Sequence, residues 1–207
     1  MPRPSRRAER TEEILDAYER CIAVHGVEGA TLERIAGEAG LARALIRHNV
    51  GNKDQLLEAF LDRFLNDSAE DMAGFFGSLP NENRLPIMID RLFDARYADL
   101  HSVEVTNALV IAASRRPDLA KRLRRWILDF VDEIMKQLAI VYSSADEEAL
   151  DAVASGIAAI YFNQESLAPL GRMPGMLKNS KNAARLLVST LEHSFSWPTD
   201  SMPGRSA

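Results

Sequence analysis

Basic side chains at helical spacing carry the most informative chemistry in this 207-residue chain. Arg43, Arg47 and His48 would share the exposed side of one short helix, and no acidic residue occurs from position 42 to position 53. An arginine presents planar hydrogen-bond donors with a fixed positive charge, which suit phosphate oxygens and the acceptor edge of guanine. The pattern therefore favours binding of a polyanion over catalysis.

Two short helices joined by a tight turn must position these side chains. Thr31 is a good helix N-cap, and Gly40 suits the left-handed residue that ends a helix. A second helix then begins near residue 41 or 42, with Leu45 and Ile46 as its buried positions. This arrangement predicts a helix-turn-helix, whose second helix is built to enter a DNA major groove. The apolar face of the first helix consists of Leu32, Ile35, Ala36 and Ala39.

From about residue 10 to residue 57 the chain resembles the DNA-binding domain of the TetR family of bacterial transcriptional regulators. The resemblance covers about a quarter of the chain and keeps many positions in register. It implies an all-α protein with an N-terminal helix-turn-helix domain and a C-terminal helical domain for ligand binding and dimerisation. The matching residues are Ile14, Leu15, Ala17, Gly26, Ala30, Thr31, Ile35, Ala36, Ala39, Gly40, Leu41, Ile46, Gly51, Asn52, Lys53, Leu56 and Leu57.

The chain departs from the family pattern on or beside the surface expected to face DNA. Ala42 stands where a small polar residue such as Ser is usual, and Arg47 stands where an aromatic residue is usual. The familiar His-Phe pair is Asn49-Val50 here. The framework positions stay apolar, so the departures affect the operator sequence and not the fold.

The helix-turn-helix position of each residue suggests its role on DNA. Arg43 is expected to contact guanine and Ala44 a thymine methyl group, because the start of the second helix reaches the base edges. Arg47, one turn later, is expected to read a base or clamp a phosphate. Further phosphate contacts are expected from Thr31, His48 and Asn49.

Two more sets of cations are assigned to the DNA backbone. Lys53 corresponds to the phosphate-binding lysine of the family. Arg3, Arg6 and Arg7 form a basic N-terminal arm that would follow the backbone or enter the minor groove.

The helical period continues to the C-terminal end and predicts about nine helices without strands. We expect a DNA-binding domain over residues 1–51, a regulatory domain over 52–197 and a disordered tail over 198–207. A long helix over about 52–77, opened by a capping box between Asn52 and Gln55, would link the two domains. A loop is expected over 167–175. The remaining helices are predicted over 8–25, 84–98, 102–115, 118–143, 146–168 and 179–196.

The C-terminal domain is expected to bind a small molecule and a second copy of the chain. The resemblance implies an effector that releases DNA, and the large side chains favour an apolar or aromatic one. Small residues over 149–162 and a leucine stripe over 186–195 predict a homodimer through the last two helices, about 146–168 and 179–196. The expected pocket residues are Phe93, Tyr97, Leu109, Trp126, Phe130, Tyr161, Asn163 and Gln164.

Composition limits the cellular compartment and the kinds of partner that the protein can have. The net charge is −5, yet residues 1–10 carry four arginines and one glutamate, so the basic character is local. A single cysteine, Cys21, allows no internal disulfide and fits a reducing compartment. No apolar run is long enough to span a bilayer, and the N-terminus lacks the apolar stretch of a signal peptide. A cytoplasmic, nucleoid-associated protein without membrane contact is therefore expected.

An enzyme is the main alternative class, but the chain lacks the motifs that would support one. His25, His48, His101 and His193 are scattered without metal-ligand spacing, and no phosphate loop, dinucleotide fingerprint or nucleophile elbow occurs. No catalytic residue, cofactor or metal is expected. Two alternatives stay open within DNA binding, namely a regulator without a small-molecule ligand and an activator in place of a repressor.

Overall fold

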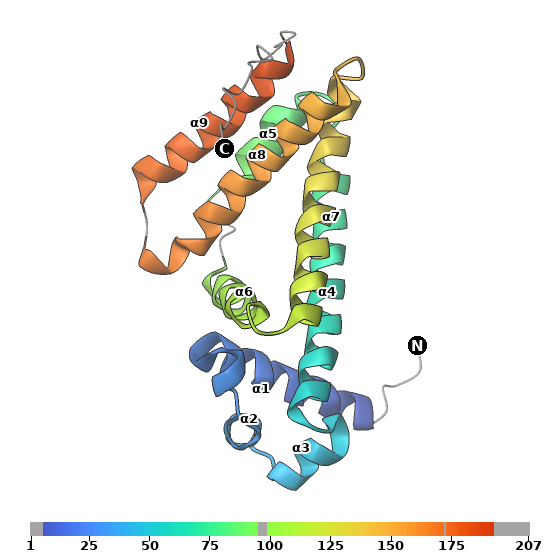
Figure 1. The fold of residues 1–207 in the computed structure, drawn as a ribbon, viewed down its shortest axis with the longest axis vertical. Helices are drawn as coiled ribbons and strands as arrows, with labels where there is room; N and C mark the ends of the chain where they lie inside the picture. The colour runs from blue at the N-terminus through green and yellow to red at the C-terminus, as the bar shows by residue number, and fades with distance from the viewer. Residues whose placement is uncertain (1–5, 95–98, 172, 193–207) are drawn as a thin grey trace, which may run out of the picture.

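The computed structural model describes residues 6–94, 99–171 and 173–192. In these ranges the chain forms nine α-helices and two short 3-10 helices, without a strand. The molecule is elongated, with α1 to α3 gathered at one end and α8 and α9 side by side toward the other (Figure 1). The helices are α1 (Arg6–Gly29), α2 (Leu32–Ala39), α3 (Arg43–Val50), α4 (Lys53–Gly77), α5 (Arg84–Leu92), α6 (Leu100–Ala113), α7 (Pro117–Val141), α8 (Glu147–Ser166) and α9 (Pro174–Ser189).

The all-α class predicted from the sequence is confirmed, and two hydrophobic cores organise it. The first core joins α1, α2, α3 and the start of α4 to buried residues of α6 and α7. The second core lies among α5, α7, α8 and α9 and includes Phe76 near the end of α4. The α6 residues Val105, Leu109 and Ala112 therefore pack with the N-terminal helices, on the far side of the domain limit predicted at residue 51. That limit stays a prediction.

Capping residues in the sequence predicted the start of several helices correctly. Thr31 Oγ1 accepts a hydrogen bond from the Arg34 N–H at 3.3 Å, which caps α2. Asn52 and Gln55 form the predicted capping box, since each side chain accepts from the backbone N–H of the other at 2.9 Å. Such caps satisfy N–H groups that the helix itself leaves unpaired. Cys21 is buried in the first core.

Three predicted boundaries were wrong. Helix α1 continues to Gly29 past the predicted end at residue 25, because Gly26 takes a positive φ of 68° and lets the chain kink and resume. Helix α5 ends at Leu92, where Phe93 turns away and packs edge-on against Tyr161. Helix α9 begins at Pro174 and not at 179, since proline suits the first helical position. The predicted ends at 98 and 196 lie outside the described residues, as does the tail.

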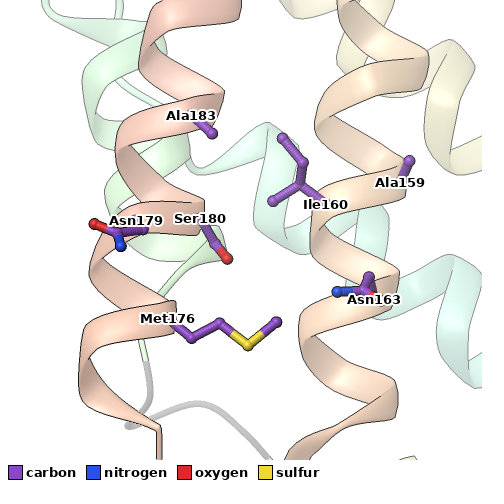
Figure 2. A pocket seen from close by; sticks show the side chains of 7 residues that line it. All are labelled: Ala159, Ile160, Asn163, Met176, Asn179, Ser180 and Ala183. Carbon is purple, nitrogen blue, oxygen red and sulfur yellow. The ribbon is translucent and has the colours of Figure 1, made fainter.

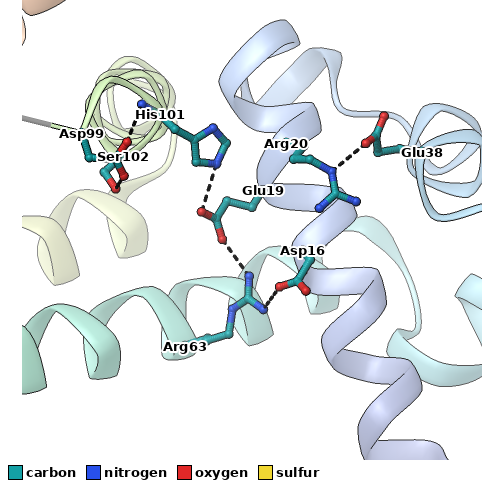
Figure 3. Close-up of polar contacts among 8 residues, drawn as sticks. All are labelled: Asp16, Glu19, Arg20, Glu38, Arg63, Asp99, His101 and Ser102. Atoms are coloured by element: carbon teal, nitrogen blue, oxygen red, sulfur yellow. Dashed lines mark hydrogen bonds and ion pairs between the residues drawn. The ribbon is translucent and has the colours of Figure 1, made fainter.

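Arg63 on α4 and its acidic partners on α1 connect three helices of the N-terminal half of the sequence. Its guanidinium donates to the carboxylates of Asp16 at 2.6 Å, Glu19 at 2.8 Å and Glu12 at 3.2 Å, all on α1. The other Glu19 oxygen lies 3.1 Å from His101 Nε2 on α6 (Figure 3). Because the Arg63 side chain is only 17% exposed, this cluster is weakly screened and fixes α1 against α4 and α6.

A second set of arginines ties α7 to the start of α4. Arg116 pairs with Glu28 at the end of α1 and with Asp54 on α4, at 3.1 and 3.0 Å. The hydrogen bond from Arg116 holds the pKa of the Glu28 carboxyl below its usual value. One turn and a half later, Arg122 pairs with Glu58 and Asp62 of α4. Helices α4 and α7 thus run parallel and in register from their first turns (Figure 1).

Removing the Arg63 charge should destabilise the protein measurably. Arg63→Met keeps the apolar stem but leaves three acidic side chains of α1 without their shared partner, so we expect a loss of about 1–2 kcal/mol in the free energy of unfolding. Urea denaturation followed by circular dichroism measures it. Arg125→Met is the matched control, because Arg125 pairs only within α7 and is exposed. Equal midpoints for both variants would contradict a role for Arg63 in joining the helices.

Candidate nucleic-acid interface

The turn between α2 and α3 sets the direction of the candidate DNA-reading helix. Gly40 adopts φ 64°, the left-handed conformation, and ends α2, while the Leu41 N–H donates to Ala36 O at 2.9 Å. Arg20 on α1 donates to Glu38 on α2 at 2.6 Å (Figure 3). Ile35 and Ile46 are fully buried in the first core and anchor the two helices. The backbone of α3 is therefore held by packing on its inner side.

The outer side of α3 presents the residues predicted to contact DNA. Arg43, Ala44, Arg47 and His48 are all exposed. Within the described residues, none of the three basic side chains forms an ion pair or a side-chain hydrogen bond, so their donors are available to a ligand. Helix α3 lies at the end of the molecule farthest from α9 (Figure 1). This position leaves it accessible to a long, straight polyanion.

The departure at Ala42 has a structural consequence. Ala42 is the N-cap residue of α3 and supplies no side-chain hydrogen bond, because it has no polar atom. The first N–H groups of α3 therefore lack the cap that Thr31 gives to α2. Uncapped N–H groups at a helix N-terminus attract anions such as phosphate.

Other predicted DNA contacts are already engaged within the chain. The Lys53 ammonium donates to the Glu28 carbonyl at 2.8 Å and lies 3.4 Å from the Glu28 carboxylate. Asn49 is half-buried and donates to Leu45 O at 2.8 Å, within α3 itself. The Thr31 N–H donates to Gly29 O, which leaves its exposed hydroxyl as the group able to donate to a phosphate. Lys53 and Asn49 would have to exchange partners to contact DNA.

The N-terminal arm is described only in part. Arg6 and Arg7 are exposed in the first turn of α1, and Arg3 lies outside the described residues. Arg10 pairs with Glu13 at 2.8 Å. Among the described residues, the positive charge without an acidic partner at this end of the molecule includes Arg6, Arg7, Arg34 and the outer side of α3.

Aromatic rings from four helices meet where the ligand pocket was predicted. The Phe130 ring lies 5.1 Å from Tyr161 and 5.3 Å from Phe162, and Phe93 lies 6.3 Å from Tyr161, centroid to centroid. Trp126 packs on Phe162 and donates its indole N–H to Ser68 Oγ at 2.6 Å. Burial raises the pKa of the Tyr161 hydroxyl to about 12. In this state the rings fill the space between them.

The other predicted pocket residues lie elsewhere. Leu109 is fully buried in the first core, among the N-terminal helices. Asn163 is exposed beside α9, and Gln164 accepts a hydrogen bond from Ser180 Oγ at 3.2 Å. Tyr97 lies outside the described residues. The structure therefore gathers four of the eight predicted pocket residues, namely Phe93, Trp126, Phe130 and Tyr161, in or next to one aromatic cluster.

A wide groove of about 730 Å³ separates the outer sides of α8 and α9, and we call it the α8–α9 groove. Ile160 of α8 faces Met176, Ser180 and Ala183 of α9 across it (Figure 2). The small residues predicted for close helix approach divide between two roles. Ala154 and Ala158 are buried in the second core, whereas Ala152, Ser155 and Ala159 are exposed along α8.

Sequence patterns gave no signal for the long-range polar pairs. Arg84 Nε donates to Gln137 Oε1 at 2.8 Å, although the two residues are 53 positions apart. The pairs Glu28–Arg116 and Glu19–His101 are still farther apart in sequence, by 88 and 82 positions. Among the described residues, no group of three or more His, Cys, Asp or Glu side chains is arranged to hold a metal ion. No helix in those ranges is long and apolar enough to cross a membrane.

A comparison with known protein families finds a match over the helix-turn-helix. Residues 14–60 match the family model described as "Bacterial regulatory proteins, tetR family". This segment is therefore similar to the DNA-binding domain of TetR-family regulators. The match begins in α1 and ends in α4, so it contains the capped turn and the exposed side of α3 described above.

Relatives and solved structures agree with this assignment. The chain is 43% identical over 65 residues to the HTH-type transcriptional repressor AcnR of Corynebacterium jeikeium, which is 31% of either chain. It is 33% identical over 116 residues to AcnR of Corynebacterium glutamicum, or 56% of this chain and 55% of that one. The chain thus spans about half the length, or less, of these curated relatives. A TetR transcription regulator from Haloarcula marismortui superposes with a TM-score of 0.72 at 20% identity, covering 88% of this chain and 97% of that one, which shows a shared fold.

Restoring a polar N-cap should stabilise α3. Ala42→Ser adds a hydroxyl that can accept from the unpaired N–H groups of the first turn, so we expect a gain of about 1 kcal/mol in the free energy of unfolding. Ala44→Ser, two residues later and exposed inside the helix, should lose about 0.5 kcal/mol because serine is a poorer helix former. Urea denaturation compares the two variants. A gain of the same size in both would show that the serine does not act as a cap.

Proposed function

We propose that this protein is a transcriptional repressor that binds a pseudo-palindromic DNA operator as a homodimer and is released by a small molecule. The observation that carries the proposal is the outer side of α3, where Arg43, Arg47 and His48 are exposed and unpaired on a helix held from behind by Ile46. The printed names of the AcnR relatives, which are repressors, support the choice of repression over activation.

The geometry of α3 supports reading of bases by its first turn. A recognition helix contacts base edges with its N-terminal residues, and here these are Arg43 and Ala44. Arg43 provides a bidentate donor for guanine O6 and N7. Arg47 and His48 then lie one turn further and suit the phosphate backbone, together with the Thr31 hydroxyl. These few contacts predict an affinity that falls steeply with salt.

A homodimer follows from the small number of base pairs that one such helix reads. Two copies related by a two-fold axis place their recognition helices in successive major grooves, about 34 Å apart. The α8–α9 groove supports such a dimer, because Ile160 and Met176 line it and Leu186, three residues beyond the lining residue Ala183 on α9, is 68% exposed. The exposed Ala152, Ser155 and Ala159 would let a partner helix approach closely.

Ion pairs between helices give a route by which a change in the C-terminal helices reaches α3. Helix α6 packs on α1 through Val105 and Leu109, and His101 holds Glu19 of α1. Helix α7 holds the first turn of α4 through Arg116, which shares Glu28 with Lys53. A displacement of α6 or α7 therefore moves the helices on which α3 rests. An effector must bind this displaced state more tightly in order to release DNA.

Operator binding should depend on Arg43 more than on net charge. Arg43→Ala removes a base contact, so we expect about a 10- to 100-fold loss of affinity for the operator, while weak binding to random DNA remains. Fluorescence anisotropy with the intergenic DNA beside its gene, at two salt concentrations, measures both. Arg125→Ala is the matched control, since it removes the same charge from an exposed site on α7. Equal losses for both variants, or no preference for that DNA over random DNA, would count against operator reading by α3 at this site.

The dimer should fail when the α8–α9 groove acquires a charge. Leu186→Glu places a carboxylate in the apolar surface that the partner would cover, so the variant should sediment as a monomer and bind the operator at least about tenfold more weakly. Sedimentation velocity gives the mass in solution. Leu128→Glu makes the same change at a half-exposed position on α7 and should stay dimeric. A dimeric Leu186→Glu protein would place the interface elsewhere.

A further inference from the structure

A second groove lies between α4 and α7 near the start of α5, and we call it the α4–α7 groove. Its volume is about 450 Å³, within the usual range for a small-molecule site. Ala69, Met72, Ala73 and Phe76 of α4 form one wall at helical spacing. The other wall carries Glu133 and Gln137 of α7 and Arg84 of α5. The site is thus apolar on one side and polar on the other.

Gln137 is a buried polar residue whose hydrogen-bonding capacity is half used. Gln137 is only 5% exposed, and its Oε1 accepts a hydrogen bond from Arg84 Nε at 2.8 Å. Since Arg84 Nε can only donate, the accepting atom is the amide oxygen, and the amide NH₂ of Gln137 is left without a partner.

The unpaired amide is open to the groove. Among the described residues, the only enclosed side-chain atom without a hydrogen bond is the Tyr18 hydroxyl. The Gln137 amide nitrogen is therefore accessible to solvent. Because Gln137 lines the groove, a ligand in the groove could reach this nitrogen. An acceptor bound in the groove could take a hydrogen bond from this donor in place of solvent.

The charges around the groove favour an anionic acceptor. Arg84 donates Nη1 to the carbonyls of Leu79 and Pro80, which fixes the guanidinium and leaves Nη2 beside the Gln137 carboxamide. The Glu133 carboxylate is paired with Lys136 on its own helix, so its charge is offset. A carboxylate placed here would receive hydrogen bonds from two neighbouring donors, one of them charged.

From these contacts we infer that the α4–α7 groove binds an apolar carboxylic acid, with the carboxylate on Arg84 and Gln137 and the hydrocarbon body against Met72 and Phe76. Phe76 also packs on Phe130, 6.0 Å between ring centroids, and so connects the groove to the aromatic cluster. A ligand between α4 and α7 would push apart two helices that run together down to the DNA-binding end (Figure 1). Calling this ligand the effector rests on the proposed function, whereas its binding does not.

Calorimetric titration of the full-length protein without DNA tests the site. The probes are octanoate and 4-phenylbutyrate, with 1-octanol and methyl octanoate as neutral controls of matched length. Saturable binding of the acids, at least about tenfold tighter than of the neutral controls, is expected. No saturable binding of either acid, or equal binding of acid and ester, would overturn the assignment.

Three variants locate the binding. Ala73→Phe fills the groove from an exposed position on α4 and should abolish binding, while Asp71→Phe on the opposite side of α4 should not. Gln137→Glu keeps an acceptor for Arg84 but replaces the free donor with a negative charge, so octanoate should bind at least about tenfold more weakly. Circular dichroism verifies that each variant is folded. Octanoate binding that survives both Ala73→Phe and Gln137→Glu would overturn the proposal.

Anisotropy with operator DNA separates this inference from the proposed function. Octanoate that binds in the groove and lowers operator affinity supports both. Octanoate that binds in the groove without changing operator affinity supports the site and contradicts its role as the effector site. Operator binding in a protein that binds neither acid leaves the DNA-reading function intact and overturns the groove assignment.

Discussion

Helix α4 belongs to both hydrophobic cores, and the rest of the structure depends on that sharing. Its first half places Leu56, Leu57 and Phe60 among the N-terminal helices, and its second half places Phe76 among α5, α7 and α8. The Asn52 cap fixes the start of the helix at Lys53, three residues after α3 ends at Val50. A rigid helix transmits a displacement at one end to the other, so α3 cannot be positioned independently of the C-terminal helices.

Ion pairs between helices add to this connection. Arg63 joins α4 to α1, His101 joins α6 to α1, and Arg116 joins the start of α7 to both α1 and α4. Each pair is partly exposed and would be weak alone. Together they connect the helices around Tyr18, whose buried hydroxyl has no hydrogen-bond partner in this state.

The N-terminal third was the most predictable part of the chain because its signals are local. Thr31, Gly40 and the Asn52–Gln55 capping box act on backbone atoms within a few residues, so spacing alone located them. The predicted end of α5 was wrong because distant packing decided it. Phe93, just after the end of α5, packs on Tyr161, which is 68 positions later in the sequence. A pattern of neighbouring residues gives no information about a contact over that separation.

The sequence by itself determined the helical class, the helix-turn-helix and the exposed basic side of its second helix. The reason is that the buried side of a helix appears in the sequence as apolar residues spaced three or four positions apart. Only the tertiary structure decided which polar groups are free. It engaged Lys53 with Glu28, placed Leu109 in the N-terminal core, and paired Arg84 with Gln137 while leaving one donor open. These outcomes depend on which helices become neighbours, and that is set by burial of apolar surface summed over the whole chain.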